Sequence, residues 1–210
     1  EGWSSDVFAA MIPYTGQANT GSILMQGGSE FIDFSNGQDM YLGTNFTVEF
    51  FMKPDQPVIA SPIFGLSPVS SVYFLLGVDN SELVFRASFQ GQIGSLVPAT
   101  MVQLGQWQHV ALVKQPGIYS IYVNGLLQHS APLAPTLDGP FWFPGTATTG
   151  DRIIGGDSGS FRGYLDEFRI SDTALTPDQF LIVPEPGTLT LMLLGAGALA
   201  AWKSSNRWTS

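Results

Sequence analysis

The chain contains no cysteine and has unusually few charged residues. The absence of cysteine excludes disulfides, thiolate metal sites, iron–sulfur clusters and cysteine nucleophiles. Charged residues make up 12% of the 210 residues, about half of the roughly 25% that is usual in soluble domains. Hydrophobic residues make up 44%. Because disordered chains combine low hydrophobicity with high charge, this composition predicts a folded domain with a core.

Basic residues are especially scarce. Eight lysines and arginines stand against 17 aspartates and glutamates, which gives a formal net charge of −9. A nucleic-acid-binding protein needs a basic surface to neutralise phosphates, so this class of function is excluded. The 24 glycines, 14 prolines and 15 phenylalanines favour many turns between aromatic strands over helices.

Alternation of apolar and polar residues predicts strands. In residues 46–53 every second residue is apolar, which places one side of an extended segment in a core. Residues 72–78 and 83–89 continue this pattern across a turn at Asp79-Asn80, as in a β-hairpin. The residues expected on the first buried face are Phe46, Val48, Phe50 and Met52.

The middle of the chain repeats the pattern around two short turns. Pro116-Gly117 separates residues 107–114 from 118–123, and Asn124-Gly125 leads into residues 126–129. Asn-Gly is a strong hairpin signal because both residues tolerate positive φ. Further strands are expected at residues 152–155 and 164–170.

The remaining segments are expected to be loops, with one short helix. Residues 54–68 and 131–150 are rich in proline, glycine, serine and threonine. Thr176, Pro177 and Gln179 have the spacing of a capping box at the start of a helix. Many short strands with frequent turns predict an all-β antiparallel sandwich.

Three motifs, of which the second and the third each consist of two stretches, carry more information than alternation alone. Residues 46–54 read FTVEFFMKP, residues 105–113 read GQWQHVALV, and residues 121–125 read IYVNG. Residues 154–157 read IGGD, and residues 161–171 read FRGYLDEFRIS. In this order they resemble the strand motifs of the LamG-like jelly roll, in the concanavalin A-like lectin/glucanase superfamily.

The resemblance covers roughly residues 20–182. It implies an antiparallel jelly-roll sandwich of the concanavalin A-like type, which we expect to occupy residues 1–182 as one domain. Phe51 stands where this family often has tryptophan, a difference that does not affect the expected fold.

The composition changes after Val183. The sequence Pro184-Glu185-Pro186 is followed by residues 187–202, which carry no charge, and then by the basic residues Lys203 and Arg207. A helix over residues 187–202 would be about 24 Å long at 1.5 Å per residue, somewhat shorter than a hydrocarbon core of roughly 30 Å. Its Leu-, Gly- and Ala-rich composition favours a short membrane-inserting helix.

Residues 183–210 resemble the bacterial PEP-CTERM sorting signal, in which a Pro-Glu-Pro motif, an apolar helix and a basic end follow one another. The resemblance implies an exported protein that is first held at the membrane by a single C-terminal helix. It also implies an exosortase as partner, which would recognise Pro184, Glu185 and Pro186 and cleave near them. A plain transmembrane anchor is the alternative interpretation.

The superfamily includes glucanases, so catalysis has to be considered. In the glucanase branch the catalytic carboxylates come from an E-x-D-x-E strand, and no such sequence is present. Asp166 and Glu167 are adjacent and are expected on opposite faces of their strand. His109 lies within a strand motif that also occurs in non-catalytic members, so we interpret it as a packed or hydrogen-bonded histidine. The sequence predicts no enzyme.

A structural calcium ion is the cofactor to consider, because folds of this superfamily often hold one. Alternation places Asp166 on the apolar face of Phe168 and Ile170, where an ionised carboxylate needs compensation. Ca²⁺ bound by Asp166 and an acid near the N-terminus, such as Glu30, could provide it. The alternative partners of Asp166 are Arg162, Arg169 or backbone N–H groups.

Exposed aromatic rings are candidates for sugar binding, because sugars stack on them. Trp142, next to Phe141 in the proline-rich stretch 137–144, is the main candidate. Packing of this loop over the edge of the sandwich is the alternative. Trp107 belongs to a motif strand and is expected in the core.

Together these features predict an exported cell-surface or extracellular module that binds carbohydrate or a matrix polymer. The sorting signal predicts residence in the cell envelope or outside the cell. One alternative is a structural protein of a biofilm matrix without a small ligand. A glycoside hydrolase-like enzyme is the other.

Overall fold

The computed structural model describes residues 2–12, 15–27, 31–33, 40–55, 60–69, 72–79, 82–89, 92–96, 102–133, 135, 138, 141–143, 152–155 and 161–182. Nearly all regular structure in these ranges is antiparallel β-strand. The first sheet contains, from edge to edge, β1 (Gly2–Ser4), β2 (Ser22–Gln26), β15 (Arg162–Ser171), β5 (Phe46–Pro54), β10 (Gln108–Gln115), β11 (Ile118–Val123) and β12 (Leu126–Pro132).

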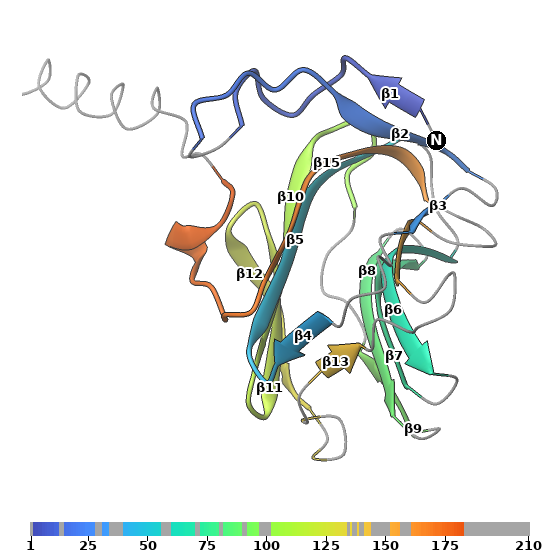
Figure 1. Cartoon of the computed structure of the whole chain (residues 1–210), viewed down its shortest axis with the longest axis vertical. Coiled ribbons are helices and arrows are strands. Elements are labelled where there is room, and N and C mark those ends of the chain that lie inside the picture. Colours follow the sequence, from blue (N-terminus) through green and yellow to red (C-terminus); the bar gives the residue numbers. More distant parts are fainter. Residues whose placement is uncertain are drawn as a thin grey trace, which may run out of the picture.

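A second sheet faces the first across the core. It contains β3 (Phe31–Asp33), β14 (Arg152–Gly155), β6 (Ala60–Val69), β7 (Val72–Asp79), β8 (Glu82–Phe89) and β9 (Gln92–Leu96). A separate pair, β4 (Met40–Gly43) and β13 (Phe141–Phe143), lies at one end of the sandwich, far from β1 at the other end (Figure 1). This is the predicted all-β jelly-roll sandwich.

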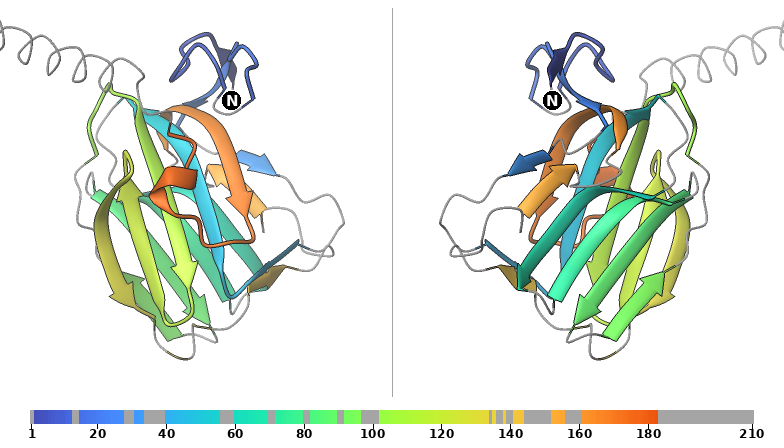
Figure 2. Two further views of the ribbon diagram at one scale, coloured as in Figure 1. Left: turned by 90° about the vertical axis from the view of Figure 1, so that its left-hand side faces the viewer. Right: turned by 90° about the vertical axis from the view of Figure 1, so that its right-hand side faces the viewer.

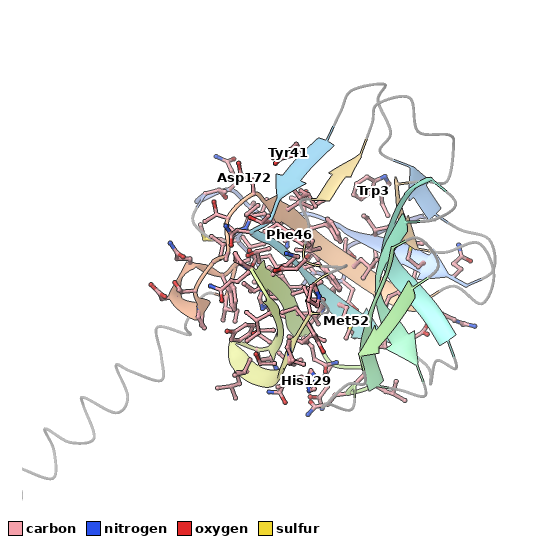
Figure 3. The ribbon with its side chains drawn as sticks, turned by 90° about the horizontal axis from the view of Figure 1, so that it is seen from below. Trp3, Tyr41, Phe46, Met52, His129 and Asp172 are labelled. Carbon is pink, nitrogen blue, oxygen red and sulfur yellow. The ribbon has the colours of Figure 1, made fainter. Side chains whose placement is uncertain are left out.

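The core lines the face of the first sheet that is turned toward the second. Phe46, Val48, Phe50 and Met52 are completely buried on β5, which confirms the predicted face. Figure 3 shows Phe46 and Met52 near the centre of the molecule. The other fully or nearly fully buried members of this cluster include Met25, Val110, Leu112, Tyr119, Ile121, Phe161 and Leu165.

The predicted hairpins are confirmed. Strands β7 and β8 pair in register from Val72–Phe89 to Asp79–Glu82. Asn124 and Gly125 connect β11 to β12 with φ values of 49° and 75°, the conformation that tight two-residue hairpin turns require.

Two strands occur where loops were expected. β6 overlaps residues 54–68 and extends one residue beyond them, and β13 lies within residues 131–150. The pairing of β6 with β7 is irregular after Pro62 and again after Leu66. Prolines cannot donate to a ladder and are tolerated at such bulges, which is why this strand has the composition of a loop.

Strand β15 contains a β-bulge that the sequence did not predict. Asp166 pairs with Phe51 and Arg169 with Glu49, so three steps on β15 match two on β5. Glu167 absorbs the extra residue with a positive φ of 48°.

The bulge changes which residues of β15 share a face. Leu165, before the bulge, and Phe168 and Ile170, after it, belong to or pack on the core cluster. The expectation that Asp166 shares the face of Phe168 and Ile170 was therefore wrong. Asp166 lies opposite Phe51 on the outer face of the first sheet.

The outer face of the first sheet is covered by two chain segments. The N-terminal segment lies over one end, and residues 172–182 cross the middle of the sheet (Figure 2). We call residues 172–182 the C-terminal strap. It contains η2 (Pro177–Gln179), a single 3-10 turn in which the Gln179 side chain accepts a hydrogen bond from the Thr176 N–H at 3.0 Å. This is the predicted capping pair, on a turn shorter than an α-helix.

Trp107 was expected in the core, and this expectation was wrong. Its indole is only partly buried on the outer face and donates a hydrogen bond to Asp6 Oδ1 at 3.1 Å. The predicted C-terminal helix, residues 187–202, lies outside the described residues. In the part of the chain that is described, no helix is long and apolar enough to cross a membrane.

Candidate functional site

The strand pair β4–β13 forms an aromatic rim at one end of the sandwich. Tyr41 on β4 pairs with Trp142 on β13, and Phe141 pairs with Gly43. The Tyr41 side chain is 63% exposed and lies at the periphery of the molecule (Figure 3). The side chains of Phe141 and Trp142 are outside the described residues, so the backbone alone places them here. Sequence reasoning missed Tyr41, because the pairing of β4 with β13 joins segments about a hundred residues apart.

Asp166, the proposed calcium ligand, is buried and already paired. Its carboxylate accepts hydrogen bonds from the Asn19 side chain at 2.8 Å and from the backbone N–H groups of Phe8, at 3.3 Å, and Glu167, at 3.0 Å. Backbone N–H groups were among the predicted alternatives, whereas the Asn19 amide was not. Both carboxylate oxygens therefore accept hydrogen bonds from N–H donors in this structure.

Glu30, the second proposed ligand, lies outside the described residues. In the described ranges, no group of three or more histidine, aspartate or glutamate side chains could hold a metal ion. The calcium site therefore stays a prediction.

A buried charged network lies on the outer face, beneath the C-terminal strap. Glu49 on β5 is completely buried, and so is nearly all of His109 on β10. The Glu49 carboxylate accepts hydrogen bonds from His109 Nε2 at 2.9 Å, Arg169 Nε at 2.6 Å and the Leu181 N–H at 2.8 Å. Each of the three motif segments identified in the sequence contributes one of these charged or polar side chains.

The surroundings of Glu49 favour its charged form. Burial alone would raise the pKa of Glu49, but the hydrogen bonds from His109, the Leu181 N–H and Arg169 outweigh burial and hold it below its ordinary value. Glu49 is thus a charged acceptor for three donors. His109 is a hydrogen-bonded strand histidine, as interpreted from the sequence.

The same network holds the C-terminal strap on the sheet. Arg169 also donates to the Gln179 carbonyl at 2.8 Å. Phe180 is completely buried beside His109 and Tyr122. Because the strap covers Glu49 and His109, a substrate cannot reach either side chain in this structure.

The N-terminal segment is fixed on the same face by a second set of contacts. Asp6 pairs with Lys53 and accepts the Trp107 hydrogen bond. The hydrogen bond from Lys53 holds the pKa of Asp6 below its usual range. These charges position the N-terminal segment against the sheet.

The proposed sorting motif, Pro184, Glu185 and Pro186, lies outside the described residues. The last described residue, Ile182, approaches the turn at Gly125, where a Cβ would meet its side chain at 3.0 Å. The chain therefore leaves the domain beside the β11–β12 hairpin.

Solved structures with a similar fold include carbohydrate-binding modules. Domain 4 of AbnA, a GH43 extracellular arabinanase from Geobacillus stearothermophilus, solved with arabinotriose, has a TM-score of 0.56 at 18% identity. The match covers 84% of this chain and 77% of that one. The CBM40 module of the Ruminococcus gnavus IT-sialidase has a TM-score of 0.57 at 16% identity, over 76% of this chain and 94% of its own. At these identities the likeness shows the fold.

Family comparison covers both parts of the sequence. No curated protein sequence matches the chain. Residues 26–180 match the concanavalin A-like lectin/glucanases superfamily, and residues 183–207 match the PEP-CTERM protein-sorting motif, which indicates an extracellular or cell-envelope protein. The chain belongs to the concanavalin A-like lectin/glucanases superfamily and carries a PEP-CTERM sorting motif directly after its jelly-roll domain.

Proposed function

We propose that this protein is a non-catalytic carbohydrate-binding module that an exosortase sorts to the cell envelope or the exterior. The observation that carries the proposal is the order of its parts: a concanavalin A-like domain ends at residue 180 and a sorting motif begins at residue 183. The fold supports a carbohydrate or matrix polymer as ligand, since two similar structures are sugar-binding domains.

The aromatic rim is the proposed sugar site. Tyr41 presents an exposed ring, and the register puts Trp142 opposite it with Phe141 adjacent in sequence. Aromatic faces with a few polar groups are the usual means of holding a sugar ring. The proposed role of Trp142 and Phe141 thus gains a third aromatic residue, Tyr41.

Two observations support a role without catalysis. The Glu49 carboxylate is used to hold three donors under the strap, and Asp166 is used to hold Asn19 and two backbone groups. Neither carboxylate is open to a glycosidic bond, which needs two accessible carboxyl groups on either side of it.

A glycan array, read with and without millimolar Ca²⁺, tests the ligand class. The wild-type protein should bind defined glycans on the array. Tyr41→Ala and Trp142→Ala should each reduce this binding at least tenfold, which would support the aromatic rim as the site. The control is Leu126→Ala, which removes an exposed apolar side chain from β12. Retention of full binding by both rim variants would contradict the site, and absence of any glycan binding would favour the structural matrix protein. Turnover of β-glucans would favour the enzyme.

The proposed sorting has its own test. In the native host, an exosortase should cleave near Pro184–Pro186 after residues 187–202 have held the protein at the membrane. The intact mass of the surface-released protein should then lack residues 203–210. A mature protein that retains this end would contradict processing and favour a plain membrane anchor.

A further inference from the structure

A hollow lies at the opposite end of the molecule from the aromatic rim. It has a volume of about 440 Å³ and is lined by Trp3, Ile12, Ala18, Asn19, Thr20, Gly21 and Glu167. Its walls come from β1, from the segment that leads into β2 and from the bulge of β15. We call it the N-terminal pocket.

The N-terminal segment builds one wall of this pocket with local hydrogen bonds. Met11 and Ala18 form an isolated β-bridge. The Ile12 N–H donates to the Gln17 carbonyl at 2.9 Å, and the Asn19 N–H donates to the Ala10 carbonyl at 3.0 Å. Asn19 then ties this wall to Asp166 on β15. The pocket is therefore attached to the sheet and is not a gap under a loose end.

Trp3 provides an open aromatic face. Its side chain is 85% exposed, and its ring packs beside Gly21, where a Cβ would lie 3.5 Å from the indole. β1 pairs with β2 from Gly2–Leu24 to Ser4–Ser22, which fixes the backbone that carries the ring. An indole is the ring on which a cation binds best.

Glu167 provides a charge without a partner. The bulge turns this residue into the pocket, and no ion pair or hydrogen bond to its carboxylate occurs in the described part of the chain. Burial, and secondarily the neighbouring Asp166 carboxylate, raise the pKa of Glu167. A cation bound beside this carboxylate would offset both effects.

Among the described residues that line the pocket there is no lysine, arginine or histidine. Trp3 and Glu167 line the same pocket, so a cation held there can contact both, and the molecule as a whole carries a net charge of −9. The net charge of the molecule therefore attracts a cation from a distance, and the pocket attracts it at close range.

We propose that the N-terminal pocket binds an organic ammonium group, which stacks on Trp3 and pairs with Glu167. The group can come from an amino sugar with a free amine or from a lysine side chain, since both present the same cation. This site is separate from the aromatic rim, and its existence does not depend on sugar binding there.

The test compares two sugars that differ in one charge. The full chain, with labelled tryptophan indoles, is titrated with glucosamine and with N-acetylglucosamine at neutral pH, and Trp3→Phe assigns the Trp3 signal. Glucosamine should shift the Trp3 signal and bind at least tenfold more tightly than N-acetylglucosamine. Glu167→Gln should weaken glucosamine binding at least tenfold by the same signal, and Trp3→Ala should weaken it at least tenfold when binding is measured by calorimetry.

The matched control is Leu126→Ala, which removes an exposed apolar side chain from β12, outside both proposed sites, and should leave glucosamine binding unchanged. A second arm of the experiment titrates Nα-acetyl-lysine methylamide, in which the ε-amine is free. Binding of both amines supports a general ammonium site, and binding of one alone identifies the source. Equal binding of the two sugars, unchanged binding by Glu167→Gln, or no Trp3 shift with either amine would overturn the proposal. Unchanged signals of the other indoles in Glu167→Gln establish that this variant is folded.

Discussion

Replacing Glu49 with glutamine should destabilise the domain strongly, because this completely buried carboxylate accepts hydrogen bonds from three donors. Its Oε1 accepts from Arg169, and its Oε2 accepts from His109 and from the Leu181 N–H. Glutamine keeps one acceptor oxygen and replaces the other with an amide that is itself a donor. Whichever way the amide turns, at least one donor faces another.

Histidine cannot relieve this conflict without a cost. If His109 moved its proton to Nδ1 to accept from the new amide, that proton would have no partner, because Nδ1 is buried and makes no hydrogen bond in the described structure. Each buried donor left unpaired costs about 1–3 kcal/mol, and breaking a buried ion pair costs about 3–5 kcal/mol. The Arg169 side chain is 33% exposed, so water can replace one bond, and we expect a loss of about 3 kcal/mol.

Urea unfolding of the full chain, followed by tryptophan fluorescence, measures this free energy. Asp172→Asn removes a negative charge from an exposed position of the C-terminal strap and should leave the midpoint unchanged. The midpoint of Glu49→Gln should fall while the slope stays constant, since the same surface is exposed on unfolding. Limited proteolysis should also cut the strap faster in this variant. A loss below about 1 kcal/mol would refute the reasoning that the network holds the fold together.

Because the folded state lowers the pKa of Glu49 from its ordinary 4.5, the stability that it contributes is complete above about pH 4.5. This stability is lost as the pH falls through the folded pKa, so urea midpoints of wild type and Glu49→Gln should converge in acid; parallel pH profiles would argue against this. Phe50→Ala should lower the free energy of unfolding, measured in urea, by about 3–5 kcal/mol, because the ring is completely buried. A loss under about 1 kcal/mol would mean that this side of β5 does not face the core. Gly163→Ala should prevent stable folding, visible as a lost thermal transition, because φ is +141° and a Cβ would lie 2.3 Å from the Lys53 carbonyl oxygen; a normal melting temperature would disprove this contact. Asp166→Asn should lower the melting temperature equally in Ca²⁺ and in EDTA, because it removes a hydrogen-bond acceptor, whereas a Ca²⁺-dependent rise that this variant abolishes would support the calcium site.

The sequence by itself determined the fold class and most strands of the sheets. The period-two pattern of β5 is local, because successive side chains of a strand point to opposite faces and the polarity of each residue indicates which face is buried. The turn at Asn124 and Gly125 is equally local, because its positive φ values depend on the two residue types themselves. The motif order then indicated the superfamily, and the tail indicated the sorting signal without any tertiary information.

The tertiary structure alone decided where the chemistry lies. A single extra residue at Glu167 moved Asp166 to the outer face, because a shift of one residue in a strand inverts every side chain beyond it. The meeting of Glu49, His109 and Arg169 depends on pairings that join distant segments, and so does the pairing of Tyr41 with Trp142. Strand patterns state which face a residue occupies only while the register is regular, and they contain no information about which distant segment covers that face.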